Sequence, residues 1–213
     1  MAQTVILTGD INLLGVEDPK IPFAQIGPIL RAANLVISNF ECCLYEPDQE
    51  RSVHDEGFYA SLASGETLLD GGIGIIGNAN NVNFGAPAIR SSCARLDELG
   101  IPHAGAGVDR QSAYAPVFVE SDGVKYGFLQ RSSVYWSHGG HEATDDHPGI
   151  AIVQAHTAYQ PLVTETKTLT RPGNPPAIVT WCEPSSLKDY QDDLAAARKQ
   201  CDVLIASNHW GCG

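Results

Sequence analysis

The chain has 213 residues, 43% of them apolar, and its 13 Lys and Arg side chains against 25 Asp and Glu give a net charge of −12 at pH 7. This length can bury a full core, so we expect one domain over residues 1–213. The charge disfavours nucleic acid as a partner, because phosphate contacts need clustered Lys and Arg, and it opposes an anionic substrate unless a cation offsets the field.

The beginning of the chain reads MAQTVILTGD and has no basic segment ahead of its apolar run. A secretory signal needs such a segment, and a membrane helix needs about eighteen consecutive apolar residues, so we expect neither and predict a cytoplasmic location. The cysteines form no CxxC pair, which favours reduced, partly buried thiols over a zinc or redox motif. They are Cys42, Cys43, Cys93, Cys182, Cys201 and Cys212.

Strand and helix patterns alternate in the first part of the chain. Val5–Asp10 and Leu35–Glu41 are continuous apolar runs, typical of strands that are buried on both faces. Between them, Pro22–Ala33 has apolar residues at helical spacing. Ser61–Leu69 predicts a short helix before a third apolar run, Ile73–Asn81. The alternation predicts βαβ units and a largely parallel sheet, hence an α/β fold.

The middle of the chain begins with a clear helix signal at Ala86–Leu99, followed by Gly100 as a left-handed cap. Ile101–Ala104 predicts a short strand. Pro116–Glu120 and Val124–Gln130 are strand-like runs on either side of Ser-Asp-Gly, which indicates a β-hairpin.

The last predicted elements are a strand at Ala177–Trp181, an amphipathic helix at Ser185–Gln200 with Ser185 or Ser186 as its N-cap, and a fourth apolar run at Val203–Gly211, again typical of a strand that is buried on both faces. A parallel sheet normally continues past such a strand, so we expect the C-terminal part of the fold to be missing. The predicted loops are Tyr45–Gly57, Ser132–Gly149 and Thr164–Pro176.

Four of the apolar runs end in side chains that can bind a metal. In open α/β sheets, ligands bind beyond the carboxyl ends of the strands, so these side chains are expected at one rim. Carboxylate, amide oxygen and imidazole together suit a divalent ion, whether Mn, Mg, Zn, Fe or Ca. The residues are Asp10, Asn39, Glu41, Asn80, Asn81 and His209.

Each of these residues also has an ordinary structural interpretation when taken alone. Asp10 can cap a turn, and Asn39 and Glu41 can bond within a loop. The pair Asn80-Asn81 is a sharper signal, because consecutive buried amides need partners and a cation can supply one. His209 is interpreted as a ligand or an acid/base group.

Two further features lie outside the strand ends that carry this cluster. Arg131 follows the run VKYGFLQ and is the best candidate for binding an anion, with a surface salt bridge as the alternative. The segment SHGGHEATDDH places His138, His141 and His147 in a polar loop, which we expect to be solvated. Substrate contact and a substitute catalytic acid are the alternatives for this loop.

Six short motifs follow one another along essentially the whole chain: GD at Gly9–Asp10, N-x-E at Asn39–Glu41, ANN at Ala79–Asn81, GAG at Gly105–Gly107, PGIA at Pro148–Ala151 and HWG at His209–Gly211. In this order they resemble the bacterial capsule-synthesis CapA family. The resemblance implies a metallophosphatase-like (calcineurin-like) α/β sandwich with one or two divalent ions and a part in making poly-γ-glutamate. It would give ligand or acid/base roles to Asp10, Asn39 or Glu41, Asn81 and His209.

The chain departs from the family's pattern at two places. Val82 stands where the family's ANNH has its histidine, which would protonate a leaving group or stabilise transition-state charge. The D-Y-G that follows in the family is Asn83-Phe84-Gly85 here, and the family's later G-H-x-P-H segment would lie beyond Gly213.

The leading hypothesis is a metal-dependent enzyme that acts on poly-γ-glutamate, an anionic polymer, or on a peptide-like substrate. His209, Asn81 and Arg131 are its predicted catalytic residues. The alternative is a non-catalytic member that binds a polymer or a partner protein, favoured by Val82. A plain phosphoesterase fits less well, because such enzymes commonly begin with D-x-H and Asp10 is followed by Ile and Asn.

Overall fold

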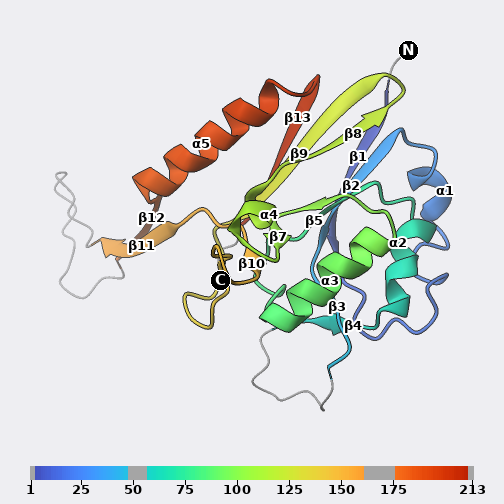
Figure 1. The fold of residues 1–213 in the computed structure, drawn as a ribbon, viewed down its shortest axis with the longest axis horizontal. Helices are drawn as coiled ribbons and strands as arrows, with labels where there is room; N and C mark the ends of the chain where they lie inside the picture. The colour runs from blue at the N-terminus through green and yellow to red at the C-terminus, as the bar shows by residue number, and fades with distance from the viewer. Residues whose placement is uncertain (1–2, 48–56, 161–175, 211–213) are drawn as a thin grey trace.

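Two stacked β-sheets form the centre of the molecule in the computed structural model, which describes residues 3–47, 57–160 and 176–210 (Figure 1). The first sheet is wholly parallel, with strand order β1-β2-β5-β6. The second has the order β13-β9-β8, in which β13 runs parallel to β9 and β8 antiparallel. The strands of these two sheets are β1 (Val5–Ile11), β2 (Leu35–Phe40), β5 (Ile75–Gly77), β6 (His103–Ala104), β8 (Val117–Ser121), β9 (Val124–Ser132) and β13 (Val203–His209).

Shorter elements surround these sheets. Three strand pairs are β3 (Cys43–Leu44) with β4 (Tyr59–Ala60), β7 (Ala106–Gly107) with β10 (Gly149–Ile150), and β11 (Ala155–Gln160) with β12 (Ala177–Cys182). The helices are α1 (Gly27–Leu30), α2 (Glu66–Asp70), which follows a 3₁₀ turn at Ala63–Gly65, α3 (Ala86–Glu98), α4 (Arg110–Tyr114) and α5 (Pro184–Arg198).

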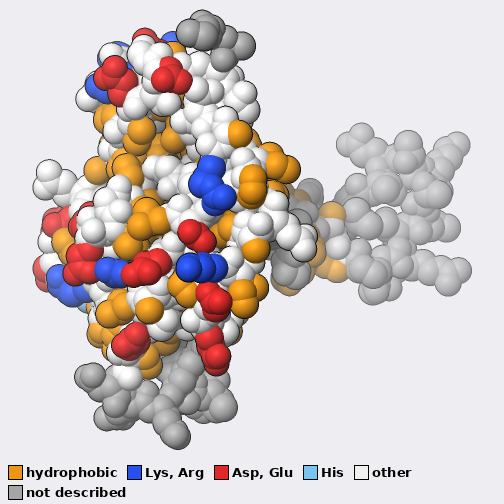
Figure 2. All heavy atoms as spheres, turned by 90° about the vertical axis from the view of Figure 1, so that its right-hand side faces the viewer, with side chains coloured by type: hydrophobic (Ala, Val, Ile, Leu, Met, Phe, Trp, Pro, Cys, Tyr) orange, Lys and Arg blue, Asp and Glu red, His pale blue; other side chains and the backbone are white. Residues whose placement is uncertain are grey.

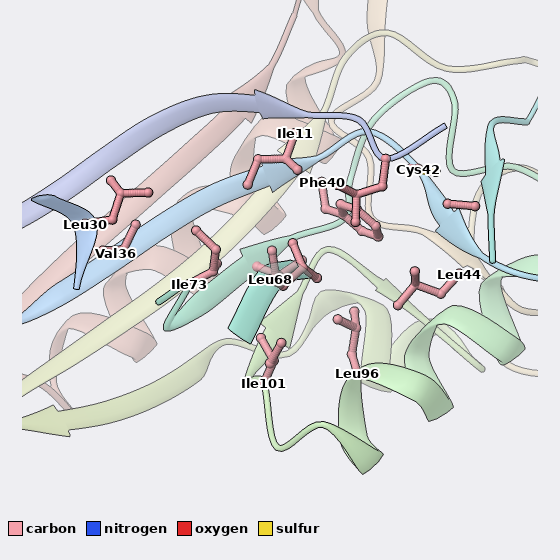
Figure 3. Close-up of a cluster of buried hydrophobic side chains, with 13 residues drawn as sticks. Ile11, Leu30, Val36, Phe40, Cys42, Leu44, Leu68, Ile73, Leu96 and Ile101 are labelled. Carbon is pink, nitrogen blue, oxygen red and sulfur yellow. The ribbon is translucent and has the colours of Figure 1, made fainter. Parts of the chain in front are cut away.

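The layering of the fold follows from the alternation of side chains along the central strands. On β2, Val36 packs in a cluster with Leu68 of α2 and Leu96 of α3 (Figure 3), whereas the next residue, Ile37, packs with Phe128 of the second sheet. A third cluster joins the far face of the second sheet to Tyr190 of α5. The result is a mixed α/β arrangement with helices outside two stacked sheets, and strands between two cores need the continuous apolar runs seen in the sequence.

The two outer strands differ from this expectation. Leu7 on β1 is 62% exposed, and Val203 on β13 is also exposed. Both strands lie at the edge of their sheets, so their expected burial on both faces is wrong, whereas β2 and β5 are buried as predicted.

Most predicted elements are present with shifted ends. The helix α3 and its cap Gly100, with φ of +68°, are confirmed, as is the hairpin of β8 and β9, where Asp122 has φ of 47°. The predicted helix Pro22–Ala33 shrinks to the short α1 with a proline in its first turn, which shows that the helical spacing there was misleading. The predicted strand Ile101–Ala104 shortens to β6.

The N-cap prediction for the last helix is wrong. Helix α5 begins at Pro184, with Glu183 at its N-cap, because proline is preorganised for the first helical position. The Ser186 hydroxyl instead accepts a hydrogen bond from the backbone N–H of Gln154 at 2.9 Å.

Several other predictions concern the surface and the thiols. The described cysteines form no disulfide with one another, and Cys42, Cys43 and Cys93 are buried. Acidic, basic and apolar side chains are interspersed on the face shown in Figure 2. No helix within the described ranges has the length and apolarity to cross a membrane. The described residues do not include Gly211 of the predicted last strand, Cys212, residues 164–175 of the predicted loop Thr164–Pro176, or residues 48–56 of the predicted loop Tyr45–Gly57.

Arg131 connects the second sheet to its helices. Its guanidinium is only 1% exposed and donates to Asp193 Oδ2 of α5 at 2.7 Å and to the carbonyl of Tyr114 at 3.0 Å. It also lies 4.5 Å from the centre of the Tyr114 ring. Of the two interpretations open from the sequence, the ion pair is the one present, with a buried guanidinium and an Asp193 carboxylate that is 42% exposed.

We predict that Asp193→Ala lowers the free energy of unfolding by roughly 2 kcal/mol, because a buried guanidinium then loses its charged partner. Asp192→Ala is the matched control: it removes the same charge from the same helix, but from an exposed pair with Lys188. That variant should change the stability by less than about 0.5 kcal/mol. Urea denaturation measures both, and equal losses would contradict a structural role for the Arg131 pair.

Candidate metal centre

Three side chains from distant parts of the chain meet at the strand ends. Asp10 lies near the end of β1, Glu41 directly follows β2, and His209 is the last residue of β13. One potential ligand atom of each lies within 4.8 Å of the others, and His209 Nε2 is 3.4 Å from Glu41 Oε1. Asp10 is exposed and the other two are half-buried. We call Asp10, Glu41 and His209 the triad.

The triad joins the two sheets, which the sequence did not indicate. Asp10 and Glu41 belong to the first sheet, in which Asp10 is in register with Asn39 of β2. His209 belongs to the second sheet, in register with Ser132 of β9. The alternation of strands and helices led us to expect one largely parallel sheet, and this expectation is wrong, whereas two stacked sheets agree with the sandwich that the family resemblance implies. The strand ends do converge at one rim, because the two sheets stack with these ends together.

A cavity of about 330 Å³ opens between the two sheets at this point. Asp10, Asn39 and His209 line it, together with Gln130 and Ser207 of the second sheet. The exposed Asp10 carboxylate and this cavity make the triad accessible to a small ligand.

Asn39 orients Asp10 rather than presenting its oxygen to the triad. Its Nδ2 donates to Asp10 Oδ1 at 2.7 Å and lies 3.4 Å from His209 Nδ1. Its Oδ1 accepts from Gln130 Nε2 at 3.0 Å and from Asn80 Nδ2 at 3.2 Å. In this arrangement Asn39 positions a ligand and is not one itself, which corrects the expectation that its amide oxygen faces a cation.

The two consecutive asparagines have different roles. Asn80 is buried, and its Oδ1 accepts from the backbone N–H groups of Val82 and Asn83 while its Nδ2 donates to the carbonyl of Phe40 at 2.9 Å. Its side chain is fully used in shaping the turn, so Asn80 is not available as a ligand here. Asn81 does reach the triad, with its Oδ1 2.9 Å from His209 Nε2.

Gln130 is the site residue that the sequence analysis missed. Its Nε2 donates to Asn39 and to Ser207 Oγ at 3.3 Å, and its Oε1 accepts from the Ala79 N–H at 2.7 Å. Gln130 ends the predicted strand Val124–Gln130, so the strand-end rule that singled out the other residues applied to it equally. Adjacent strand residues point to opposite faces, which is why Gln130 faces the site and Arg131 faces α5.

The electrostatics of the triad favour a cation. Burial raises the pKa of Glu41 above its ordinary value, and the nearby charge of Asp10 raises it further, while His209 and a hydrogen bond from Asn39 lower it. Two carboxylates therefore repel each other at the mouth of a cavity that also holds an imidazole. A divalent ion would offset this repulsion, and carboxylate and imidazole are suitable ligands for it.

His141 contradicts the expectation of a solvated loop. Its ring is only 2% exposed; Nε2 lies 3.0 Å from the Asn83 carbonyl, and Nδ1 accepts from the Trp136 N–H at 3.0 Å. Burial lowers the pKa of His141 from 6.5 to about 4, against smaller opposing effects of hydrogen bonds to backbone groups. A histidine whose ring nitrogens are both bonded does not supply the substitute acid considered from the sequence.

Two comparisons relate this chain to known proteins. The model of a protein family described as bacterial capsule synthesis protein PGA_cap matches residues 4–212. Two proteins of Sinorhizobium fredii are also similar. The uncharacterized protein y4sH is 31% identical over 129 residues, which cover 55% of this chain and 28% of that protein. The uncharacterized protein y4uA is 31% identical over 106 residues, or 46% of this chain and 23% of that protein. The matched part of the chain spans about a quarter of the length of these relatives.

We predict that Gly77→Ala destabilises the protein by roughly 1–3 kcal/mol, because a Cβ at this position would overlap the amide of Gln130. Gly9→Ala is the matched control, since a Cβ on this glycine, also near a strand end, meets no atom within 4 Å. Urea denaturation of both variants gives the free energies of unfolding. A Gly77 variant as stable as the Gly9 variant would show that the Gln130 amide tolerates displacement.

A second prediction concerns the stability of the protein at low pH. Unfolded histidine takes up a proton near pH 6.5, whereas folded His141 stays neutral down to about pH 4. Stability from this group is therefore fully present above pH 6.5 and is lost as the pH falls, by about 3 kcal/mol at pH 4. The measurement is the unfolding free energy of wild type and of His141→Gln between pH 7 and pH 4. Parallel curves for the two proteins would refute the assignment.

Proposed function

This chain belongs to the bacterial capsule synthesis protein family, and on that premise we propose that it is a single metallophosphatase-like domain that binds a divalent cation and acts on a polymer or peptide-like substrate in capsule synthesis. Poly-γ-glutamate is the substrate that the family resemblance favours. The observation that carries the proposal is the convergence of Asp10, Glu41 and His209 from two sheets to within 4.8 Å.

The triad would hold the cation, with the Asn81 amide oxygen beside it as a further donor. A bound divalent ion polarises a carbonyl or phosphoryl oxygen, or lowers the pKa of a bound water. The residues around it have supporting roles that the geometry supplies. Asn39 holds the Asp10 carboxylate, and without a cation Asn81 orients the imidazole of His209 by accepting from Nε2.

The charges of the protein and of the triad determine whether an anionic polymer can approach the site. The net charge of −12 and the carboxylates of the triad repel it, and Arg131, the cation expected from the sequence to help, is buried in its pair with Asp193. The cation of the triad is then the charge that would attract a substrate carboxylate or phosphate. A metal-free form would bind such a polymer poorly.

A second candidate function is binding without catalysis. The position where the family resemblance leads us to expect a histidine holds Val82, which is buried. Valine cannot move a proton, so a step that needs an acid at this position has no group to carry it out. A member of this kind would hold a polymer or a partner protein through the cation alone.

We predict that purified wild-type protein contains near-stoichiometric divalent metal, and that Asp10→Ala and His209→Ala each lose most of it, because each removes one of three charged or nitrogen ligands. The measurement is metal content by plasma mass spectrometry. His156→Ala is the control, since His156 lies on β11 and pairs with Glu183, which is not a triad residue.

Metal-free wild-type protein that remains folded and does not take up added Mn²⁺ or Zn²⁺ would refute the metal centre. If metal is present, hydrolysis of poly-γ-glutamate and of model phosphoesters by wild type and by Asp10→Ala separates the two candidates. Turnover lost in the variant supports the enzyme, whereas binding without turnover supports the second candidate.

A further inference from the structure

We propose that Trp136 and His141 are positioning residues of the metal centre, acting through Asn81 on His209. They belong to the loop of residues 133–141, which packs on the asparagine turn, residues 78–83. The effect on metal binding rests on the proposed function, but the effect on the geometry of His209 does not.

The loop bonds to both partners of the contact between Asn81 and His209. At its start, the backbone N–H of Ser133 donates to the carbonyl of His209 at 3.0 Å. Further along, the indole Nε1–H of Trp136 donates to the carbonyl of Asn81 at 3.0 Å. One loop therefore holds the end of β13 in the second sheet and the turn after β5 in the first, and it fixes the distance between them.

His141 fixes the position of Trp136 in this loop. Its Nδ1 accepts from the backbone N–H of Trp136, so Nδ1 has no proton and Nε2 carries one in the neutral ring. That Nε2–H then donates to the carbonyl of Asn83. The ring also packs edge-on against Phe84, with centroids 5.0 Å apart. The buried imidazole thus ties the loop backbone to the asparagine turn at a second point.

Asn81 is the residue through which the loop reaches His209. Its neighbours Asn80 and Asn83 are held from within the first sheet, since both donate side-chain hydrogen bonds to the carbonyl of Phe40. The carbonyl of Asn81 is instead held by Trp136, and its side chain contacts His209. A change in the loop is therefore transmitted to the imidazole of His209, whereas the rest of the turn keeps its own support.

This arrangement gives a structural role to His141 of the histidine-rich segment, which does not belong to the triad. His141 acts through its two hydrogen bonds and not as an acid. Outer residues that orient ligands in this way typically contribute ten- to a hundredfold to metal affinity.

The first test is calorimetric titration of the full chain with Mn²⁺. Trp136→Phe keeps an aromatic ring and removes only the N–H donor, so we expect affinity about tenfold weaker. His141→Leu should weaken it at least as much, and His141→Gln, which can accept and donate as the imidazole does, should recover part of the loss. Trp181→Phe is the control, because Trp181 is a 48% exposed residue on β12. The Mn²⁺ affinity of this variant should equal that of wild type.

The second test uses metal-free protein and separates this inference from the proposed function. NMR signals of the His209 ring, recorded at one pH, should shift in Trp136→Phe and stay in place in Trp181→Phe. Shifted signals in a protein that does not bind Mn²⁺ would support the positioning role while the metal function fails. Unshifted His209 signals in Trp136→Phe, or Mn²⁺ affinity equal to wild type in this variant and in His141→Leu, would overturn the inference.

Discussion

The side chain of Gln130 links the two sheets at the place where the candidate site is built. It extends from β9 in the second sheet and donates to Asn39 in the first, while its oxygen accepts from the backbone at Ala79. A buried amide of this kind has to satisfy both its donor and its acceptor, because an unpaired one costs about 1–3 kcal/mol. Satisfying them fixes how the sheets stack, and this stacking brings His209 to Asp10 and Glu41. Glycine at 77 leaves room for the amide, as does Gly105, whose φ is +102°.

The link through Gln130 produces a site in which the negative charges of two carboxylates are not balanced. Asp10 and Glu41 lie together because β1 and β2 are neighbours in register, not because they attract each other. Their repulsion, added to burial, raises the pKa of Glu41. Asn39 and the imidazole of His209 offset part of this cost. A site that retains unfavourable charge in a folded protein is more consistent with ligand binding than with stability, since replacing the carboxylates would relieve the strain.

Sequence patterns predicted the strands and their polar ends because both are local. An apolar run and the residue that follows it can be read without knowing which sheet the strand joins. Gln130, Arg131 and His141 show the limit of this reasoning. The alternation along β9 places Gln130 and Arg131 on opposite faces, but only the stacking of the sheets decides which face is the site. His141 lies in a run rich in Gly, Asp and Thr that resembles a solvated loop, and its burial depends on Asn83, which is 58 residues away.

His209 carries two predicted roles that compete for one nitrogen. Its Nδ1 faces the donor Nδ2 of Asn39, so the neutral ring has its proton on Nε2, where it donates to Asn81. To bind a cation through Nε2, the neutral ring would have to carry its proton on Nδ1 instead, and the Asn81 oxygen would then be free to turn toward the same cation. To act as an acid through Nε2, the ring must be the imidazolium, protonated on both nitrogens, and must leave the cation to the carboxylates. The residue that orients Nε2 therefore decides between the two roles, which is why support of Asn81 by a distant loop has functional weight.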